Sequence, residues 1–222
     1  MPKYGSPGKY TRENFPVKSV NVSSESSPLS SERGELKTEL VRKCIHIFIA
    51  FVPFLARINF SHTALLLMGG VLLYTGAESL RFLGFSTPFI SSVTAVVIRK
   101  RELGHFVLAP VTLGIGALLA LLLFPPQAAA AAIYALAFGD SVSAIIGRFL
   151  GRIRPAFLKG KSLEGSLACF AAAAFAGFLV FHNWKTALAV GLASFVVDML
   201  PLGDFDNLIL PLAAGLSALF FQ

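Results

Sequence analysis

Long apolar runs, separated by short charged or turn-forming segments, fill the chain from about residue 40 to its end. Seven of these runs are near the ~20 residues that a helix needs to cross a bilayer. They cover residues 40–57, 62–83, 103–124, 127–150, 163–181, 184–201 and 206–221. Because only helices and closed barrels satisfy their backbone in lipid, the pattern predicts an all-α, polytopic transmembrane protein of about seven spans.

Two segments depart from this pattern. Residues 1–38 are rich in Ser, Pro and charge and contain no apolar run resembling a signal peptide. We expect them to be a disordered tail that precedes a membrane domain of residues 39–222. Residues 85–98 carry several hydroxyl groups and a proline, and we expect a re-entrant or interfacial segment there rather than an eighth span. The composition fits a membrane protein, since 55% of the residues are hydrophobic and 14% are charged.

The basic residues predict an orientation. With alternating spans, all of the 19 Lys and Arg residues except Arg57 and Lys185 fall on one side. Basic loops tend to remain cytoplasmic, so we expect the N-terminus inside, in a bacterial cytoplasmic membrane. The net charge of +7 then belongs to the cytoplasmic face, where it attracts anionic headgroups or a polyphosphate. Nucleic acid is not expected as a partner, because the chain has no soluble basic domain.

Asp140 stands inside the fourth apolar run, in the stretch GDSVSAIIGRFLG. An acid within a span costs free energy unless it is partnered, which makes it a functional candidate. Steps of three and four residues place a small, polar set on its helix face, namely Asp140, Ala144, Gly147, Arg148 and Gly151. The glycines also fit a small-residue packing seam, with the acid paired to a neighbouring helix.

The end of this span and the loop that follows it carry five cations, which fit an anion of several negative charges. Arg148 and Lys161 can contact phosphate oxygens. Ser162 either donates its hydroxyl or caps the next span, whose first turn contains Glu164. Three glycines allow close backbone approach, and these are Gly151, Gly160 and Gly165.

A phosphate of this kind brings Mg²⁺ with it, and Asp140 would hold that ion. The loop is not a Walker A sequence, since the pattern GxxxxGK[ST] is absent from it. A nucleotide site here is therefore built differently.

The stretch GDSVSAIIGRFLGRIRPAFLKGKSLEGSLA resembles the cytidine-nucleotide motif of the CTP-dependent polyprenol kinase family, which includes dolichol kinase, phytol kinase and CTP-dependent diacylglycerol kinase. In that motif an Asp precedes two glycines four residues apart, and eight residues later comes a Lys-Lys-Thr-x-Glu-Gly element. Asp140, Gly147 and Gly151 fall in register, and GKSLEG follows. Lys161 is left as the principal loop cation. The departures are Ser143 for Ala, Gly160 for the first Lys and Ser162 for Thr.

Two further segments resemble the same family. RKCIH is similar to its Arg-Lys-x-x-His element and contributes Arg42, Lys43 and His46. LPLGDFDNLILPL is similar to its Asp-Asn-Leu-x-x-Pro element and contributes Asp206 and Asn207. Simpler interpretations are a lipid anchor for the first segment and a helix cap or turn for the second. The predicted topology nevertheless places both on the same face as the central motif, which favours one shared site.

The resemblance implies transfer of the γ-phosphoryl group of CTP to the hydroxyl of a membrane lipid, either diacylglycerol or a polyprenol- or phytol-type alcohol. Asp140 would carry Mg²⁺, and Lys161 and Arg148 would bind phosphates. Asp206 would hold metal or accept the hydroxyl proton. Glu102, on the same side, either joins the site or balances the loop cations.

Two other functions stay open. A CTP:phosphatidate cytidylyltransferase has a similar central stretch, but its family's Pro-Gly-His-Gly-Gly-x-x-Asp-Arg-x-Asp signature is absent from this sequence. A transporter or scaffold with a basic face is the third candidate, although no repeated halves with matching broken helices are evident. Cys44 and Cys169 have no metal or redox spacing, and we expect both to be buried apolar residues.

Overall fold

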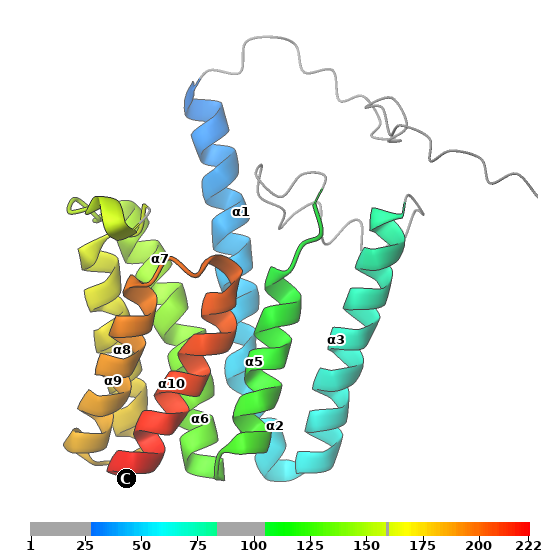
Figure 1. Cartoon of the computed structure of the whole chain (residues 1–222), viewed down its shortest axis with the longest axis vertical. Coiled ribbons are helices and arrows are strands. Elements are labelled where there is room, and N and C mark those ends of the chain that lie inside the picture. The colour runs from blue at the N-terminus through cyan, green and yellow to red at the C-terminus, as the bar shows by residue number, and fades with distance from the viewer. Residues whose placement is uncertain (1–27, 84–104, 159) are drawn as a thin grey trace, which may run out of the picture.

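The computed structural model describes residues 28–83, 105–158 and 160–222. Every long element in this part is a helix, and successive helices run up and down the bundle (Figure 1). The α-helices are α1 (Pro28–Phe48), α2 (Val52–Ile58), α3 (Phe60–Phe82), α5 (Ala109–Leu123), α6 (Pro126–Tyr134), α7 (Asp140–Phe149), α8 (Leu163–Phe181), α9 (Trp184–Met199) and α10 (Asp206–Phe221). Short turns include the π-helix η4 (Ala135–Gly139) and the 3₁₀ helix η6 (Gly203–Phe205).

Four described helical segments are long and apolar enough to cross a membrane. They are Phe60–Phe82, Pro126–Phe149, Leu163–Phe181 and Gly203–Phe221. The all-helical class is confirmed for the described residues, while the count of seven spans and the orientation stay predictions. Helix α1 begins at Pro28, within the segment expected to be a tail. The expected re-entrant segment 85–98 and Glu102 lie outside the described residues.

Caps and prolines in the sequence explain several helix starts. The side chain of Asn59 accepts a hydrogen bond from the His62 backbone N–H, and α3 begins at Phe60, directly after Asn59. Asn183 caps α9 in the same way. Prolines stand in the first turns of α2, α5 and α6, where a missing N–H costs no helical hydrogen bond. These signals set the helix boundaries that carry the charged residues.

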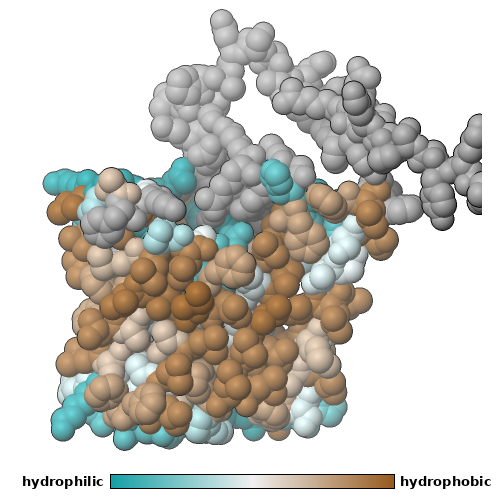
Figure 2. All heavy atoms as spheres, viewed as in Figure 1, coloured by the Kyte–Doolittle hydropathy of each residue, from teal (hydrophilic) through white to brown (hydrophobic). Residues whose placement is uncertain are grey.

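Small residues form the core. Alanines on α5, α6, α8, α9 and α10 are fully buried, among them Ala117, Ala132, Ala173, Ala187 and Ala214. Their short side chains allow close helix approach, and larger buried side chains such as Ile133, Leu136 and Leu210 fill the remaining space. The outer surface instead exposes many large apolar side chains, which form a hydrophobic belt between two hydrophilic ends (Figure 2). A belt of this extent fits contact with lipid.

The cysteines behave differently from each other. Cys169 is buried as expected, but Cys44 is exposed, so the prediction for Cys44 was wrong. Helix α1 buries Arg42, Lys43 and His46 and turns Cys44 outward. The polar face of this helix, rather than its thiol, packs into the protein.

Candidate active site

Asp140 is the first residue of α7 and directly follows the π-helix η4. A π-turn inside a helix often marks a functional position. The Asp140 Oδ2 atom lies 2.5 Å from Lys43 Nζ and 3.0 Å from His46 Nδ1, both on α1. The three side chains are largely buried, with exposed fractions of 14%, 7% and 5% respectively. The acid in the apolar span is therefore partnered by the RKCIH segment.

Lys161 forms a second charged centre. Its Nζ atom lies 2.6 Å from Asp206 Oδ2, and it donates to the backbone carbonyls of Asp198 at 2.6 Å and Leu200 at 3.2 Å. The loop between α7 and α8 is thus tied to the end of α9 and the start of α10. The other Asp206 oxygen, Oδ1, is buried and accepts no hydrogen bond from the described residues. Lys161 Nζ also lies 3.8 Å from Asp198, whose carboxylate accepts a hydrogen bond from Ser143, one turn after Asp140 on α7. The two centres therefore lie side by side and form one charged cluster.

Asp206 and Asn207 contact other helices rather than capping α10. No side-chain hydrogen bond caps the start of α10, so the cap interpretation of Asp206 was wrong. The Asn207 side chain donates to the Ala109 carbonyl at 3.3 Å and the Thr112 hydroxyl at 3.1 Å. These bonds fix the first turn of α10 against α5 and hold Asp206 facing Lys161.

Arg42 links α1 to the same end of the bundle. Its guanidinium lies 3.5 Å from Glu39 and 3.7 Å from Asp204, which belongs to η6. The three motif segments therefore meet at one end of the molecule, at the top of Figure 1. The structure brings together three pairs from separate segments: Lys43 with Asp140, Arg42 with Asp204, and Lys161 with Asp206. The side of the membrane on which this end lies stays a prediction.

The motif glycines lie around Ser162, at the crossing of α7 and α8. A Cβ atom at Gly147 would lie 2.9 Å from the Ser162 hydroxyl, and one at Gly165 would lie 2.8 Å from the Ser143 carbonyl. A Cβ atom at Gly151 would lie closer still, 2.5 Å from the Ser162 hydroxyl. The Ser162 hydroxyl accepts from Gly165 N–H at 3.1 Å and caps α8. These contacts support the packing seam, while a nucleotide role for the glycines stays a prediction.

The rest of the loop is folded upon itself. Glu164 accepts hydrogen bonds from the backbone N–H groups of Arg152 and Ile153, both at 3.0 Å. Arg154 donates to the carbonyls of Gly160 and Gly147, both at 2.6 Å. Gly160 itself has φ +96 with open space around its Cβ position, so the turn requires a glycine. Glu164 thus orders the loop in this structure, and its contact with a nucleotide stays a prediction.

The chain is similar to a CTP-dependent lipid kinase. It is 26% identical over 167 residues to CTP-dependent diacylglycerol kinase 1 of Schizosaccharomyces pombe, an alignment that covers 72% of this chain and 75% of the relative. No family model matches the chain, and no solved structure matches it. The similarity supports the relationship to CTP-dependent lipid kinases in general.

Asp198 is a site residue that the sequence analysis missed. Its carboxylate is 5% exposed and accepts hydrogen bonds from the hydroxyls of Ser143 at 3.1 Å and Ser166 at 2.7 Å. Lys161 Nζ lies 3.8 Å from the same carboxylate. The signal was present, because Asp198 is an acid near the end of an apolar run, as Asp140 is.

The carboxylates fit a magnesium ion that arrives with a phosphate. The described residues contain no ready-made group of three His, Cys, Asp or Glu ligands. Mg²⁺ commonly uses one or two protein carboxylates together with substrate phosphates and water. The Oδ1 atom of Asp206 is buried and accepts no hydrogen bond from the described residues, so it is suited to act as such a carboxylate ligand. The predicted pair Asp140 and Asp206 is consistent with this use.

Proposed function

We propose that this protein is a CTP-dependent lipid kinase that transfers the γ-phosphoryl group of CTP to a membrane lipid alcohol. The observation that carries the proposal is the charged cluster in which Lys43 meets Asp140 and Lys161 meets Asp206. It lies where α1 contacts the start of α7 and where the loop before α8 contacts the start of α10. The relative from fission yeast, named for the use of CTP on diacylglycerol, supports the same chemistry.

Phosphoryl transfer needs positioning and charge neutralisation more than covalent catalysis. Lys43, Lys161 and Arg148 supply positive charge from three segments of the chain. The lipid hydroxyl oxygen attacks the γ-phosphorus, the bond from that phosphorus to the β,γ-bridging oxygen breaks, and CDP leaves. Asp206 accepts the hydroxyl proton or helps to hold the metal.

Mg²⁺, when bound, neutralises charge on the transferring phosphates, and Asp140 and Asp206 would hold it. Lys43 and Lys161 neutralise these same carboxylates in the structure. Phosphate oxygens offer the ammonium groups a second partner. We infer that nucleotide binding exchanges part of these internal ion pairs for contacts with phosphate.

Diacylglycerol is the acceptor that we propose first, because the relative is a diacylglycerol kinase by name. A polyprenol- or phytol-type alcohol is the alternative acceptor. Purified protein supplied with each lipid and CTP would separate them by the rate of lipid monophosphate formation.

The cytidylyltransferase alternative is tested by CTP labelled at one phosphate. A kinase places the γ label in a lipid monophosphate. A cytidylyltransferase acting on phosphatidate places the α label in a CDP-lipid. Absence of both products with these acceptors would favour the transporter or scaffold.

A further inference from the structure

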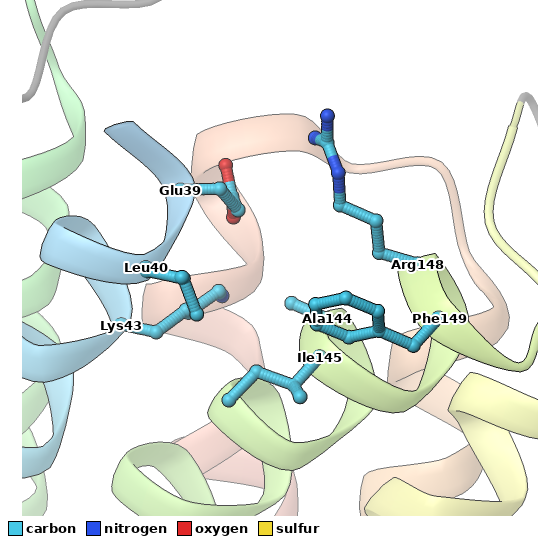
Figure 3. A pocket seen from close by; sticks show the side chains of 7 residues that line it. All are labelled: Glu39, Leu40, Lys43, Ala144, Ile145, Arg148 and Phe149. Carbon is cyan, nitrogen blue, oxygen red and sulfur yellow. The ribbon is translucent and has the colours of Figure 1, made fainter. Parts of the chain in front are cut away.

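A groove lies between α1 and α7, beside the charged cluster. The groove is shallow and open to the surface, and the space within it that a water-sized group can occupy is about 10 Å³. Its lining residues are Glu39, Leu40, Lys43, Ala144, Ile145, Arg148 and Phe149. Figure 3 shows the side chains of Leu40, Ile145 and Phe149 around the space and the charged group of Arg148 pointing away at its rim.

We propose that this groove receives the hydroxyl-bearing end of the lipid acceptor. The inference rests on the proposed function and deepens it by naming the acceptor site. A lipid alcohol has a long apolar chain that ends in one small polar group. The groove likewise has apolar lining residues, such as Leu40 and Ile145, next to a charged one, Lys43.

Lys43 connects the groove to the charged cluster. This side chain lines the groove, and its Nζ lies 2.5 Å from Asp140 Oδ2. A hydroxyl that contacts Lys43 would therefore be separated from the Asp140 carboxylate, which the proposed transfer uses, by the Lys43 ammonium group alone. The lipid hydroxyl would not have to pass through the core to reach Asp140. The core is closed by the packed alanines of α6 and α8.

The surroundings of the groove fit a lipid chain. Leu40 is 37% exposed, and Phe149 and Leu150 at the end of α7 are 61% and 62% exposed. The groove is too small for a whole lipid, so most of the chain would lie along these exposed apolar side chains. Glu39 and Arg148 at the rim are suited to the polar interface.

The lining also predicts selectivity. Ala144 is the smallest side chain of the groove, and a larger residue there would occupy the space that Leu40 and Ile145 leave open. Ala144→Trp should raise the KM for the lipid by about tenfold or more and leave the KM for CTP nearly unchanged. Leu188→Trp is the matched control, because Leu188 is an exposed side chain on α9, 52% accessible, away from the groove.

The direct test uses the full chain in phosphatidylcholine vesicles with a diacylglycerol whose acyl chain carries a photoreactive diazirine near the glycerol. We expect crosslinks at Leu40, Ile145 or Phe149, reduced by excess diacylglycerol and not by CTP, and reduced about tenfold in Ala144→Trp. Crosslinks confined to other helices would overturn the inference, as would labelling of these residues that CTP alone suppresses.

This experiment separates the inference from the proposed function, because crosslinking requires no turnover. Crosslinks in the groove without phosphoryl transfer would reject the kinase and retain a lipid site. Normal transfer with crosslinks elsewhere would retain the kinase and reject the groove. If Ala144→Trp does not fold, the position of the crosslinks in the unmodified protein still decides.

Discussion

Lys161 Nζ lies 2.6 Å from Asp206 Oδ2, although 45 residues separate them in the sequence. This pair joins the basic loop after α7 to the first turn of α10. It also places Lys161, the principal cation of that loop, directly against Asp206 of the LPLGDFDNLILPL segment. Two segments that each have a simple local explanation therefore form one charged centre.

Lys161→Ala should reduce phosphoryl transfer by at least about 100-fold, because it removes a cation positioned for phosphate. Lys185→Ala is the control, since Lys185 stands at the start of α9, at the opposite end of the bundle. Initial rates with CTP and diacylglycerol would measure both. Equal losses in the two variants would show that the loss reflects general damage rather than the site.

Asp140→Asn should abolish transfer and also destabilise the protein. Removing an unpaired acid from an apolar span would relieve a charge, but the structure shows Lys43 buried against Asp140. An unpaired buried ammonium costs about 3 kcal/mol. Thermal unfolding in detergent would measure the loss.

The double variant Lys43→Met with Asp140→Asn separates the two effects. Replacing a buried ion pair by apolar or neutral groups is often close to neutral in stability, so we expect unfolding near the wild-type temperature without transfer activity. Recovery of activity together with stability would show that Asp140 serves packing alone.

Gly116→Ala should lower stability by about 1–3 kcal/mol. A Cβ at Gly116 would collide with the Asn207 carbonyl and push α10 from α5, which displaces Asp206. Gly69→Ala is the matched control, because no atom lies within 4 Å of its Cβ position. The control should be neutral or up to about 1 kcal/mol more stable. Similar unfolding temperatures for both variants would contradict the close α5–α10 contact.

The orientation can be tested with single cysteines after Cys44 and Cys169 are changed to Ala. An impermeant thiol reagent should label cysteines at Arg152 and Asp204 only from the cytoplasmic side, and a cysteine at Lys185 only from outside. Labelling of Arg152 and Asp204 from opposite sides would contradict the structure. Reversal of all three would contradict only the predicted orientation.

The sequence contained enough to predict the helices and the meeting of the motif segments. Apolar runs of span length and capping residues such as Asn59 and Ser162 act locally, so they can be recognised along the chain. Asp140 could be selected because charge is costly within an apolar bundle, and Lys161 because it is a cation of the loop after that span. Asp206 was selected by its resemblance to the closing motif of a known family. The resemblance to a known family then indicated that they act together.

The partners of these charges could not be predicted, because they depend on helix packing. Nothing local to Lys43 says that it meets Asp140, 97 residues away. Nothing local to Asp198 says that Ser143 and Ser166 donate to it from two other helices. Glu164 was expected near a nucleotide because it belongs to the motif, whereas its contacts depend on how the loop folds back.

The central claim is tested most directly by following the γ-phosphate of CTP into lipid. Purified wild-type protein and the stable double variant Lys43→Met with Asp140→Asn would be placed in vesicles containing diacylglycerol, with Mg²⁺ and γ-labelled CTP. The account predicts labelled lipid monophosphate from the wild type and none from the variant, which excludes a contaminating kinase. Equal labelling by both proteins, or no labelled lipid from a folded wild type with any of the acceptor alcohols, would contradict it.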